Sequence, residues 1–535
     1  MKILTDLFED CLEAAGVPRT LAIIVPSDRP DLADFQCNAA LAASKTLGKP
    51  PRQIAQEVVD SFSDHRFSLS IAGPGFINIR VNDQLLEQSV GLTQPLPRRG
   101  DLKFIDYGGP NVAKAMHVGH LRSLVIGNSL GKILDYQGYD VISDIHWGDW
   151  GYQMGLVLCA LMSDGFQDWG GQNYTIEHLQ KIYPLAAQYA KENEQFRSDA
   201  VDLTRRLQLF EDHLIGMWQK IFDATSTSVM ADLKILNVEF DLYNGESTVG
   251  ALLPDMWEDL VRRELIAISD GADVIYCLDE KLPPLIFRNS EGGFLYAATD
   301  LATIQERAAS NPSEIIYVVD QRQELHFRQV FDVAGQLGYD VKLTHVGFGT
   351  IQGFDGKPFR TRAGGVPKLR DLLDEAVSKA LTKNDDPETA RKVAMAAIKF
   401  NDLQNKRSTN YAYDIDRALA HEGKTGPYLL YQLVRMNSIM EKREVEPGAV
   451  KITNDDERQI VLDLLKFNSV LDKTVEQMSP HLLAEYLYGL AQKFSAYYAK
   501  HTISNDPSRL ALVLVIQDHL RTGLGLLGIE TVESM

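Results

Sequence analysis

The chain contains 535 residues, of which 45% are hydrophobic and 24% are charged, and its formal net charge at pH 7 is −19. This length exceeds what one hydrophobic core organises and predicts roughly three or four domains, while the composition is that of an ordinary globular protein. No apolar run is long enough to span a bilayer, which excludes a membrane partner, and the acidic amphipathic start of the chain does not resemble a secretory signal.

Cysteine spacing and charge distribution narrow the choice of compartment and partner. The four cysteines lie far apart and form no C-x-x-C pair, which predicts reduced thiols in the cytoplasm and neither a structural zinc site nor disulfide bonds. Residues 1–384 carry 36 basic and 52 acidic side chains, whereas residues 385–535 carry 18 and 21. A negative whole-chain charge counts against a nucleic-acid partner, but the nearly neutral C-terminal third can present a local basic face to phosphates.

The first 95 residues alternate helix-like and strand-like segments. Residues 1–16 are predicted to form an amphipathic helix, a second helix is predicted at about 36–47, and a third begins at the proline pair of PPRQIAQEVVDSF. The segment FSLSIAGPGFINIRV predicts two short strands around a Gly-Pro-Gly turn. We therefore expect an N-terminal α+β domain over residues 1–95 and a linker at 95–100.

From residue 101 the pattern changes to strands alternating with helices. Strands are expected at 101–107, 139–145, 313–320 and 341–349, and helices at 119–138, 153–165 and about 322–337. Such alternation predicts an α/β fold, a Rossmann-like, doubly wound parallel sheet. The interval at about 170–265 is helical and is interpreted as an insertion. The α/β domain is therefore expected at 101–384, and an all-α helical bundle at 385–535.

Two histidines, His117 and His120, flank Gly119 in the sequence HVGH, between a predicted strand and a predicted helix. At the carboxyl ends of strands in a doubly wound sheet, helix N-termini present free N–H groups to anions. Side chains at i and i+3 share one helix face, so both imidazoles can face one phosphate, and the glycine lets a flat base approach the backbone. Two such donors would stabilise the charge that develops as pyrophosphate leaves an α-phosphate. Taken alone, the tetrapeptide is equally compatible with incidental surface histidines, and a metal site lacks further ligands nearby.

The surrounding sequence resembles a known family. The stretch DYGGPNVAKAMHVGHLRSLVIGNSLGKILDYQGYDVISDIHWGDWGYQMGL resembles the signature block of arginyl-tRNA synthetases, which are class I aminoacyl-tRNA synthetases. The resemblance continues through FLYAATDLA, IYVVDQRQELHFRQVF, GKPFRTRAGGVPKLRDLLDEA and HEGKTGPYLLYQLVR to the end of the chain. The first 95 residues are similar to the N-terminal domain specific to that family. The resemblance thus covers essentially the whole chain in the family's order.

The resemblance implies roles for individual residues. The arginine pocket is expected to use a carboxylate and an aromatic ring, which suit a planar cation. Without the family context, an acidic residue near the start of a helix would be explained by the helix dipole. The implied arginine-binding residues are Asn111, Asp149, Tyr296, Asp300 and Gln323. The implied ATP-binding residues are His117, Gly119, His120, Gly347 and Lys357. The implied catalytic residues are Lys114, His117, His120, Arg360 and Arg362. Trp147 and Trp150, beside Asp149, are expected to be packing residues.

Two positions depart from the family's pattern. Many members carry an asparagine where Ile145 stands, so neighbouring Asp144 or His146 would have to supply a polar group there. The second departure is the loop KPFRTRAGG, where class I synthetases usually carry a KMSKS-type sequence and where Thr361 takes the place of the second lysine. Members that lack this lysine have one just upstream of the histidine motif, and Lys114 occupies that position here. A cation can stabilise phosphate charge from either side of the site, since the Coulomb energy depends on distance and dielectric.

The C-terminal bundle is implied to bind the anticodon stem-loop of tRNA. Its tyrosines could stack on unpaired bases, although burial in the bundle core is the favoured role for each of them, namely Tyr411, Tyr413, Tyr497 and Tyr498.

The resemblance implies an arginine–tRNA ligase that uses ATP with Mg²⁺ and L-arginine, acts on tRNA(Arg), needs no structural metal, and works as a monomer in the cytoplasm. Two alternatives stay open, namely a catalytically inactive tRNA-binding paralogue and a paralogue that transfers arginine to another acceptor.

Overall fold

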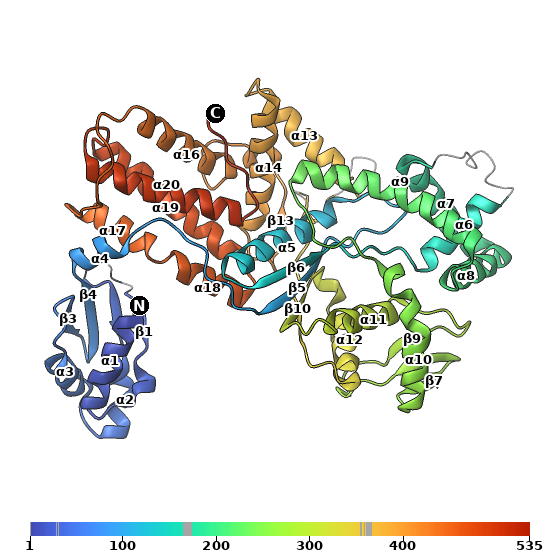
Figure 1. Ribbon diagram of the computed structural model, residues 1–535, viewed down its shortest axis with the longest axis horizontal. Helices are drawn as coiled ribbons and strands as arrows, with labels where there is room; N and C mark the ends of the chain where they lie inside the picture. Colours follow the sequence, from blue (N-terminus) through green and yellow to red (C-terminus); the bar gives the residue numbers. More distant parts are fainter. Residues whose placement is uncertain are drawn as a thin grey trace. The chain divides into compact units, whose positions relative to one another are not determined.

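The structure is a computed structural model that describes residues 2–27, 29, 32–163, 174–353, 356–357, 359 and 366–535 (Figure 1). The chain forms two compact units, each built from segments distant in sequence. The first unit contains residues 1–93, 438–468 and 492–519, and the second contains residues 94–437, 469–491 and 520–535. All four cysteines are free. Among the described helices, none is both long enough and apolar enough to cross a membrane.

The N-terminal part of the first unit is an antiparallel sheet with helices, as the sequence predicts. Its strands are β1 (Ile24–Pro26), β2 (Phe35–Cys37), β3 (Phe67–Ala72) and β4 (Phe76–Val81), in the order β1-β2-β4-β3, and its helices are α1 (Lys2–Ala14), α2 (Ala39–Leu47), α3 (Pro51–Ser61) and α4 (Asp83–Ser89). The helix expected at about 36–47 begins only at Ala39. Residues 35–37 are instead a strand paired with β4, because sheet pairing and the burial of Cys37 override a weak local preference.

A buried ion pair joins this sheet to α17 (Asp455–Leu464) within the same unit. The guanidinium of Arg458 donates to both carboxylate oxygens of Asp34, at 2.6 and 2.9 Å, and to the carbonyl oxygen of Val81. Its Nε donates to Asp83 at 2.8 Å. Because the Arg458 and Asp34 side chains are 3% and 1% exposed, removal of Arg458 would leave the buried Asp34 carboxylate without its ionic partner, and removal of Asp34 would leave the buried guanidinium with the half-exposed Asp83.

The second unit contains the predicted parallel sheet, in the order β11-β10-β5-β6. The elements are β5 (Leu102–Tyr107), α5 (Val118–Tyr136), β6 (Asp140–Asp144), α6 (Tyr152–Met162), β10 (Glu314–Val318), α12 (Glu324–Leu337) and β11 (Lys342–His345). All three strand pairs are parallel. Gly127 lets α5 lie against β5, since a Cβ there would come within 2.2 Å of the Tyr107 side chain.

The predicted insertion is helical, and it is followed by a small sheet that the sequence analysis did not anticipate. Its helices are α7 (Ile176–Glu192), α8 (Glu194–Gln208), α9 (Asp212–Leu236), a 3-10 helix (Glu246–Leu252) and α10 (Leu253–Arg262). The antiparallel sheet β7-β8-β9 follows, over Ile266–Ser269, Ala272–Ile275 and Leu285–Arg288, and leads into α11 (Tyr296–Ala308). Four-residue strands give too little alternation to be recognised by periodicity.

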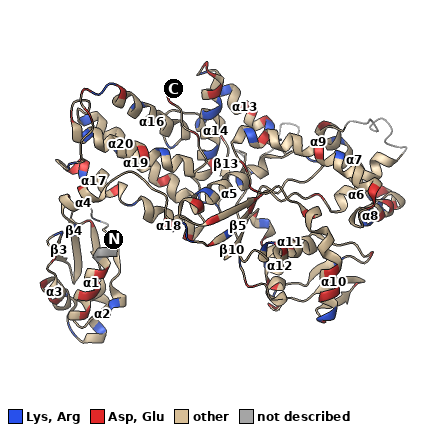
Figure 2. Ribbon diagram, viewed as in Figure 1, with Lys and Arg blue, Asp and Glu red and all other residues tan. Residues whose placement is uncertain are grey.

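Beyond the sheet the chain is helical, as predicted. The helices are α13 (Leu369–Leu381), α14 (Pro387–Leu403), α15 (Ile415–Ala418), α16 (Gly426–Glu441), α17, α18 (Phe467–Gln477), α19 (His481–Lys500) and α20 (Pro507–Leu526). One parallel pair, β12 (Ile351–Gln352) with β13 (Tyr411–Ala412), interrupts them. Both signs of charge occur on α8, α10 and α13 (Figure 2). Of the four tyrosines considered for stacking, Tyr411, Tyr413 and Tyr497 are buried, as favoured, whereas Tyr498 is 42% exposed.

Candidate active site

The histidine pair forms the N-terminal cap of α5, at the end of the segment that connects β5 to this helix. His117 is the N-cap residue, and its Nδ1 accepts a hydrogen bond from the backbone N–H of Gly119 at 3.0 Å. The Nδ1 of His120 accepts from the backbone N–H of His117, also at 3.0 Å. The two rings lie 4.0 Å apart between centroids. Gly119 is required for this arrangement, since a Cβ there would come within 2.7 Å of the His117 ring.

The tautomer with the ring proton on Nε2 lets each Nδ1 accept its backbone N–H, and the Nδ1 of His120 also lies 3.2 Å from the carbonyl oxygen of His117. In this tautomer each Nε2–H is a donor. Burial, followed by the neighbouring His117 ring and the Lys114 ammonium, lowers the pKa of His120 to about 3. Burial also lowers the pKa of His117. Both rings are therefore neutral hydrogen-bond donors at pH 7.

Lys114 lies close to this pair, and its ammonium is 4.2 Å from the ring centroid of Tyr183 on α7. This position combines a cation–π contact with proximity to the histidines, whose pKa values its charge lowers. Of the loop residues expected to assist, Lys357 is exposed, and its carbonyl oxygen accepts from Gly353 N at 2.9 Å. Arg360 and Arg362 lie outside the described residues.

Gly347 lies just past β11, at the same sheet edge as the histidine motif. Its carbonyl oxygen accepts from the guanidinium of Arg407 at 2.6 Å, and a Cβ there would come within 3.3 Å of the Gln321 backbone. Two residues on, the carbonyl oxygen of Gly349 accepts from Arg122 of α5 at 2.9 Å. Arg122 is itself buried and pairs with Asp402 at 2.9 Å, so the histidine helix and the segment after β11 are held together.

A second cluster is formed by α11 and α12. Tyr296, the first residue of α11, is 62% exposed, and Asp300 lies one turn further along. The Oδ2 of Asp300 contacts the Nε2 of His326 on α12 at 2.5 Å. The ring of His326 is 4.7 Å from that of Tyr296. The sequence analysis missed His326, although QRQELHF places it three residues after Gln323 at the start of a helix.

Two further polar residues are Gln323, which precedes α12, and Glu246, which begins the 3-10 helix Glu246–Leu252. Gln323 is exposed in the 3-10 turn Gln321–Gln323 that precedes α12. Glu246, which the sequence analysis did not identify, accepts from Trp150 N at 3.2 Å. Burial, followed by the charge of Asp149, raises the pKa of Glu246 to about 7, and Asp300 contributes in the same direction. Glu246 therefore lies within electrostatic range of Asp149 and Asp300.

Asn111 and Asp149 lie in the segments that follow β5 and β6. Asn111 pairs with the backbone of Gly148, and its Oδ1 accepts from Gln153 Nε2 at 3.1 Å. Asp149 is buried, and its carboxylate accepts from the backbone N and the hydroxyl of Ser247 at 2.9 and 2.6 Å. Its oxygens therefore hold the segment around Glu246 in place. Trp147 and Trp150 are each 1% exposed, consistent with packing.

Ile145 is fully buried, and its polar neighbours face away from solvent beneath α11. One guanidinium nitrogen of Arg307 donates to Asp106 and to Asp144, both at 2.7 Å. His146 Nδ1 lies 3.5 Å from the same Asp144 oxygen. Among the described residues, Asp106, Asp144 and His146 offer ligand atoms within 4.8 Å of one another, but the Arg307 cation already pairs with both aspartates. The trio is thus an ion network that anchors α11 to the sheet.

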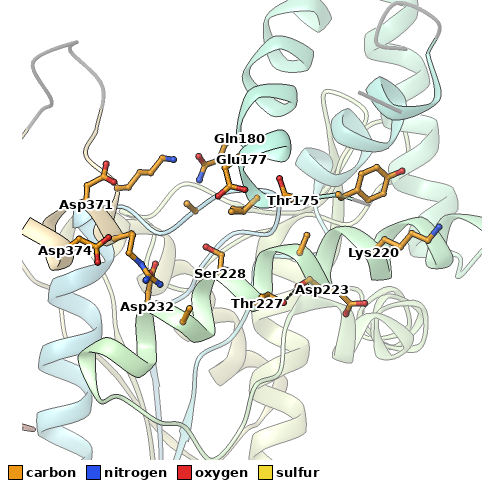
Figure 3. Close-up of a pocket in the computed structure, with 17 residues that line it drawn as sticks. Thr175, Glu177, Gln180, Lys220, Asp223, Thr227, Ser228, Asp232, Asp371 and Asp374 are labelled. Carbon is orange, nitrogen blue, oxygen red and sulfur yellow. Dashed lines mark hydrogen bonds and ion pairs between the residues drawn. The ribbon is translucent and has the colours of Figure 1, made fainter. Parts of the chain in front are cut away.

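A cavity of about 890 Å³ opens beside the histidine segment (Figure 3). It is lined by Ala115 and by residues of α7, α9 and α13, and none of the site residues expected from the sequence contributes to it. Its charged lining residues are Glu177, Lys220, Asp223, Asp232, Lys368, Arg370, Asp371 and Asp374. Because carboxylates outnumber cations, this cavity suits a triphosphate poorly.

The parallel sheet carries the histidine pair at the start of α5 and the carboxylate of Asp300 on α11. This is the arrangement of a class I aminoacyl-tRNA synthetase. The family description "tRNA synthetases class I (R), catalytic domain" matches residues 82–415. The "Arginyl tRNA synthetase N terminal domain" matches residues 2–81, and the "DALR anticodon binding domain" matches residues 429–535.

Relatives and solved structures agree along the whole chain. It is similar to an arginine–tRNA ligase of Hyphomonas neptunium, with 41% identity over 98% of this chain and 97% of the relative. A second relative, from Alkaliphilus oremlandii, shares 38% identity over 100% of this chain and 99% of its own length. Two solved arginyl-tRNA synthetase structures have the same fold. The structure from Plasmodium falciparum has a TM-score of 0.85 and 23% identity, over 100% of this chain and 99% of its own. The structure from Thermus thermophilus has a TM-score of 0.80 and 26% identity, over 100% of both chains.

The chain therefore belongs to the arginyl-tRNA synthetase family. This finding confirms the predicted family, the α/β fold class and the activity, that of a ligase joining arginine to tRNA. The predicted domain limits at 95, 101 and 384 stay predictions, as do the roles of the individual site residues.

Proposed function

We propose that the two clusters at this sheet edge hold the two small substrates, L-arginine at α11 and ATP at the start of α5. The observation that carries the arginine assignment is the half-buried carboxylate of Asp300 beside the exposed ring of Tyr296. A guanidinium requires a carboxylate for charge-assisted hydrogen bonds and an aromatic face for stacking. Glu246, whose pKa is raised to about 7, adds a partly ionised carboxyl group to the same region. Asn111, Asp149 and Gln323 complete its polar surroundings in this proposal.

On the ATP side, the neutral Nε2–H groups of His117 and His120 would donate to phosphate oxygens. Their value lies in the transition state, because charge accumulates on the phosphates as the bond to pyrophosphate breaks. Gly119 leaves room for the base, and Gly347 follows β11, which β10 separates from β5. Lys114, with Lys357, Arg360 and Arg362 of the loop, would supply positive charge. Imidazole and ammonium N–H donors do not bind magnesium, so Mg²⁺ would arrive on the ATP phosphates.

The reaction proceeds in two transfers. A carboxylate oxygen of arginine attacks the α-phosphorus of ATP, the bond to pyrophosphate breaks, and arginyl-adenylate forms. A hydroxyl of the terminal ribose of tRNA then attacks the carbonyl carbon, and AMP leaves with the bonding electrons. In this proposal the N-terminal domain and the C-terminal bundle contact tRNA(Arg). The monomeric state and the cytoplasmic location stay predictions.

One assay tests this function directly. Purified protein is incubated with ATP, Mg²⁺, a tRNA pool and each labelled amino acid in turn. We expect labelled tRNA with arginine and none with the others. No charging with any amino acid would contradict the activity, and charging with a different one would contradict the assignment of the pocket.

A further inference from the structure

We propose that His326 is a positioning residue of the arginine pocket, which holds the Asp300 carboxylate in the orientation that receives the substrate guanidinium. This inference rests on the proposed assignment of Asp300 to arginine binding. None of the residues expected from the sequence has this task.

The geometry places His326 against both residues of the proposed pocket. Its Nε2 lies 2.5 Å from the Oδ2 of Asp300, and its ring is 4.7 Å from that of Tyr296. The two side chains of the pair are 16% and 22% exposed, so each is largely shielded but still reaches the pocket. Asp300 and Tyr296 belong to α11 and His326 to α12, which are adjacent helices (Figure 1). The contact therefore fixes the carboxylate from outside its own helix.

The chemistry of the pair makes His326 the donor at this position. An ionised carboxylate only accepts hydrogen bonds, so the proton of the contact lies on Nε2 of His326. The imidazole occupies one carboxylate oxygen of Asp300, Oδ2. The other oxygen, Oδ1, stays available to the guanidinium. A lysine in place of His326 would also donate, but its charge would neutralise Asp300 and repel the substrate cation.

A second explanation for the contact is a purely structural one, in which His326 stabilises the packing of α12. The ring of His326 also contacts Phe327, 5.1 Å away between centroids. Gln329, on the same helix, provides a matched control. Its amide donates to the carbonyl oxygens of Pro283 and Pro284 at 2.8 and 3.1 Å, away from the pocket. Gln329→Leu removes hydrogen bonds of α12 without altering Asp300.

The experiment compares three substitutions in the full-length enzyme with tRNA. His326→Gln retains a neutral N–H near the position of Nε2, His326→Leu removes the donor, and His326→Lys retains a donor but adds a charge. Aminoacylation kinetics give the KM for arginine, the KM for ATP and kcat. We expect the leucine and lysine variants to raise the arginine KM by about 10-fold or more. We expect the glutamine variant to stay within about 3-fold of the parent, and the ATP KM to stay within about 2-fold in all three.

The outcomes separate this inference from the assignment on which it rests. A parental arginine KM in His326→Leu, or an equal rise of both KM values, would overturn the positioning role. So would the same rise in Gln329→Leu, which would point to helix packing. Asp300→Asn is measured in parallel. If that variant has a parental arginine KM, the pocket itself is wrongly assigned; if only the His326 variants are parental, the pocket stands and His326 has no part in it.

Discussion

His120 has two nitrogens with two separate tasks, and two substitutions divide them. Its Nδ1 accepts from the backbone N–H of His117 at 3.0 Å, which caps α5, while its Nε2–H is the proposed donor to phosphate. An asparagine places its amide oxygen near the position of Nδ1, and a glutamine reaches the position of Nε2. We therefore expect His120→Asn to keep the cap and lose the donor, and His120→Gln to do the reverse.

The magnitudes follow from what each substitution removes. Loss of one preorganised donor to transition-state charge costs about 10²-fold in kcat, so we expect this loss in the asparagine variant with little change in the ATP KM. Loss of the cap costs about 1 kcal/mol of stability, so the glutamine variant should melt at lower temperature but retain most of its turnover. Arginine-dependent ATP–pyrophosphate exchange with tRNA present measures the first quantity, and thermal unfolding measures the second. Equal turnover in the two variants would refute the division of tasks.

The same residue also gives a pH dependence of stability. Burial lowers the pKa of His120 from 6.5 in the unfolded chain to about 3 in the folded protein, so the unfolded chain binds the proton more readily. The stabilisation is complete above pH 6.5 and is lost as the pH falls below it. With allowance for partial exposure of the ring, stability should fall by about 1 kcal/mol between pH 7 and pH 5. Denaturant unfolding measures this loss, and His120→Asn should abolish it. An unchanged loss in that variant would show that other groups cause it.

Three further changes probe other parts of the molecule. Asp300→Asn should lower kcat/KM for arginine by about 10²-fold without changing the ATP KM, because a charge-assisted hydrogen bond is lost, and charging kinetics would reveal it. Arginine-dependent ATP–pyrophosphate exchange should be negligible without tRNA, and strong exchange by the tRNA-free enzyme would contradict this expectation. With tRNA present, Lys114→Ala should abolish the exchange while tRNA binding, measured in a filter assay, persists. Asp34→Ala should destabilise the first unit by about 3 kcal/mol, because the buried Arg458 guanidinium loses its bidentate partner and keeps the ion pair with Asp83. The double variant with Arg458→Met should recover much of the loss in calorimetry.

The sequence predicted the parts of the fold that depend on local pattern. The parallel strands and their helices have strong periodicity over long segments, and the histidine motif lies where a strand meets a helix. Elements that depend on partners were not predicted. Residues 35–37 become a strand because β4 pairs with them, and β7 to β9 are four-residue strands with little signal of their own.

For the site, resemblance identified residue types but not their partners. Tyr296 and Asp300 were expected, yet the closest partner of Asp300 comes from α12, more than 20 residues away in sequence. Glu246 was missed for a similar reason, since its proximity to Asp149 and Asp300 arises only when the insertion folds back against the sheet. A single histidine or glutamate within a helical pattern carries no sequence signal of such contacts.

The two halves of the site are held by different parts of the structure, and this separates specificity from chemistry. The histidine pair is fixed by hydrogen bonds from the backbone N–H groups of His117 and Gly119, within the same turn at the start of α5. The arginine pocket is carried by α11, which Arg307 anchors through Asp106 and Asp144 at the other end of the helix. Although Asp106 lies on β5, the histidine pair keeps its own backbone hydrogen bonds, so changes beneath α11 should alter arginine recognition more than phosphate stabilisation. The burial of Ile145 is consistent with this view, since the polar side chains on either side of it serve the helix anchor and not the pocket surface.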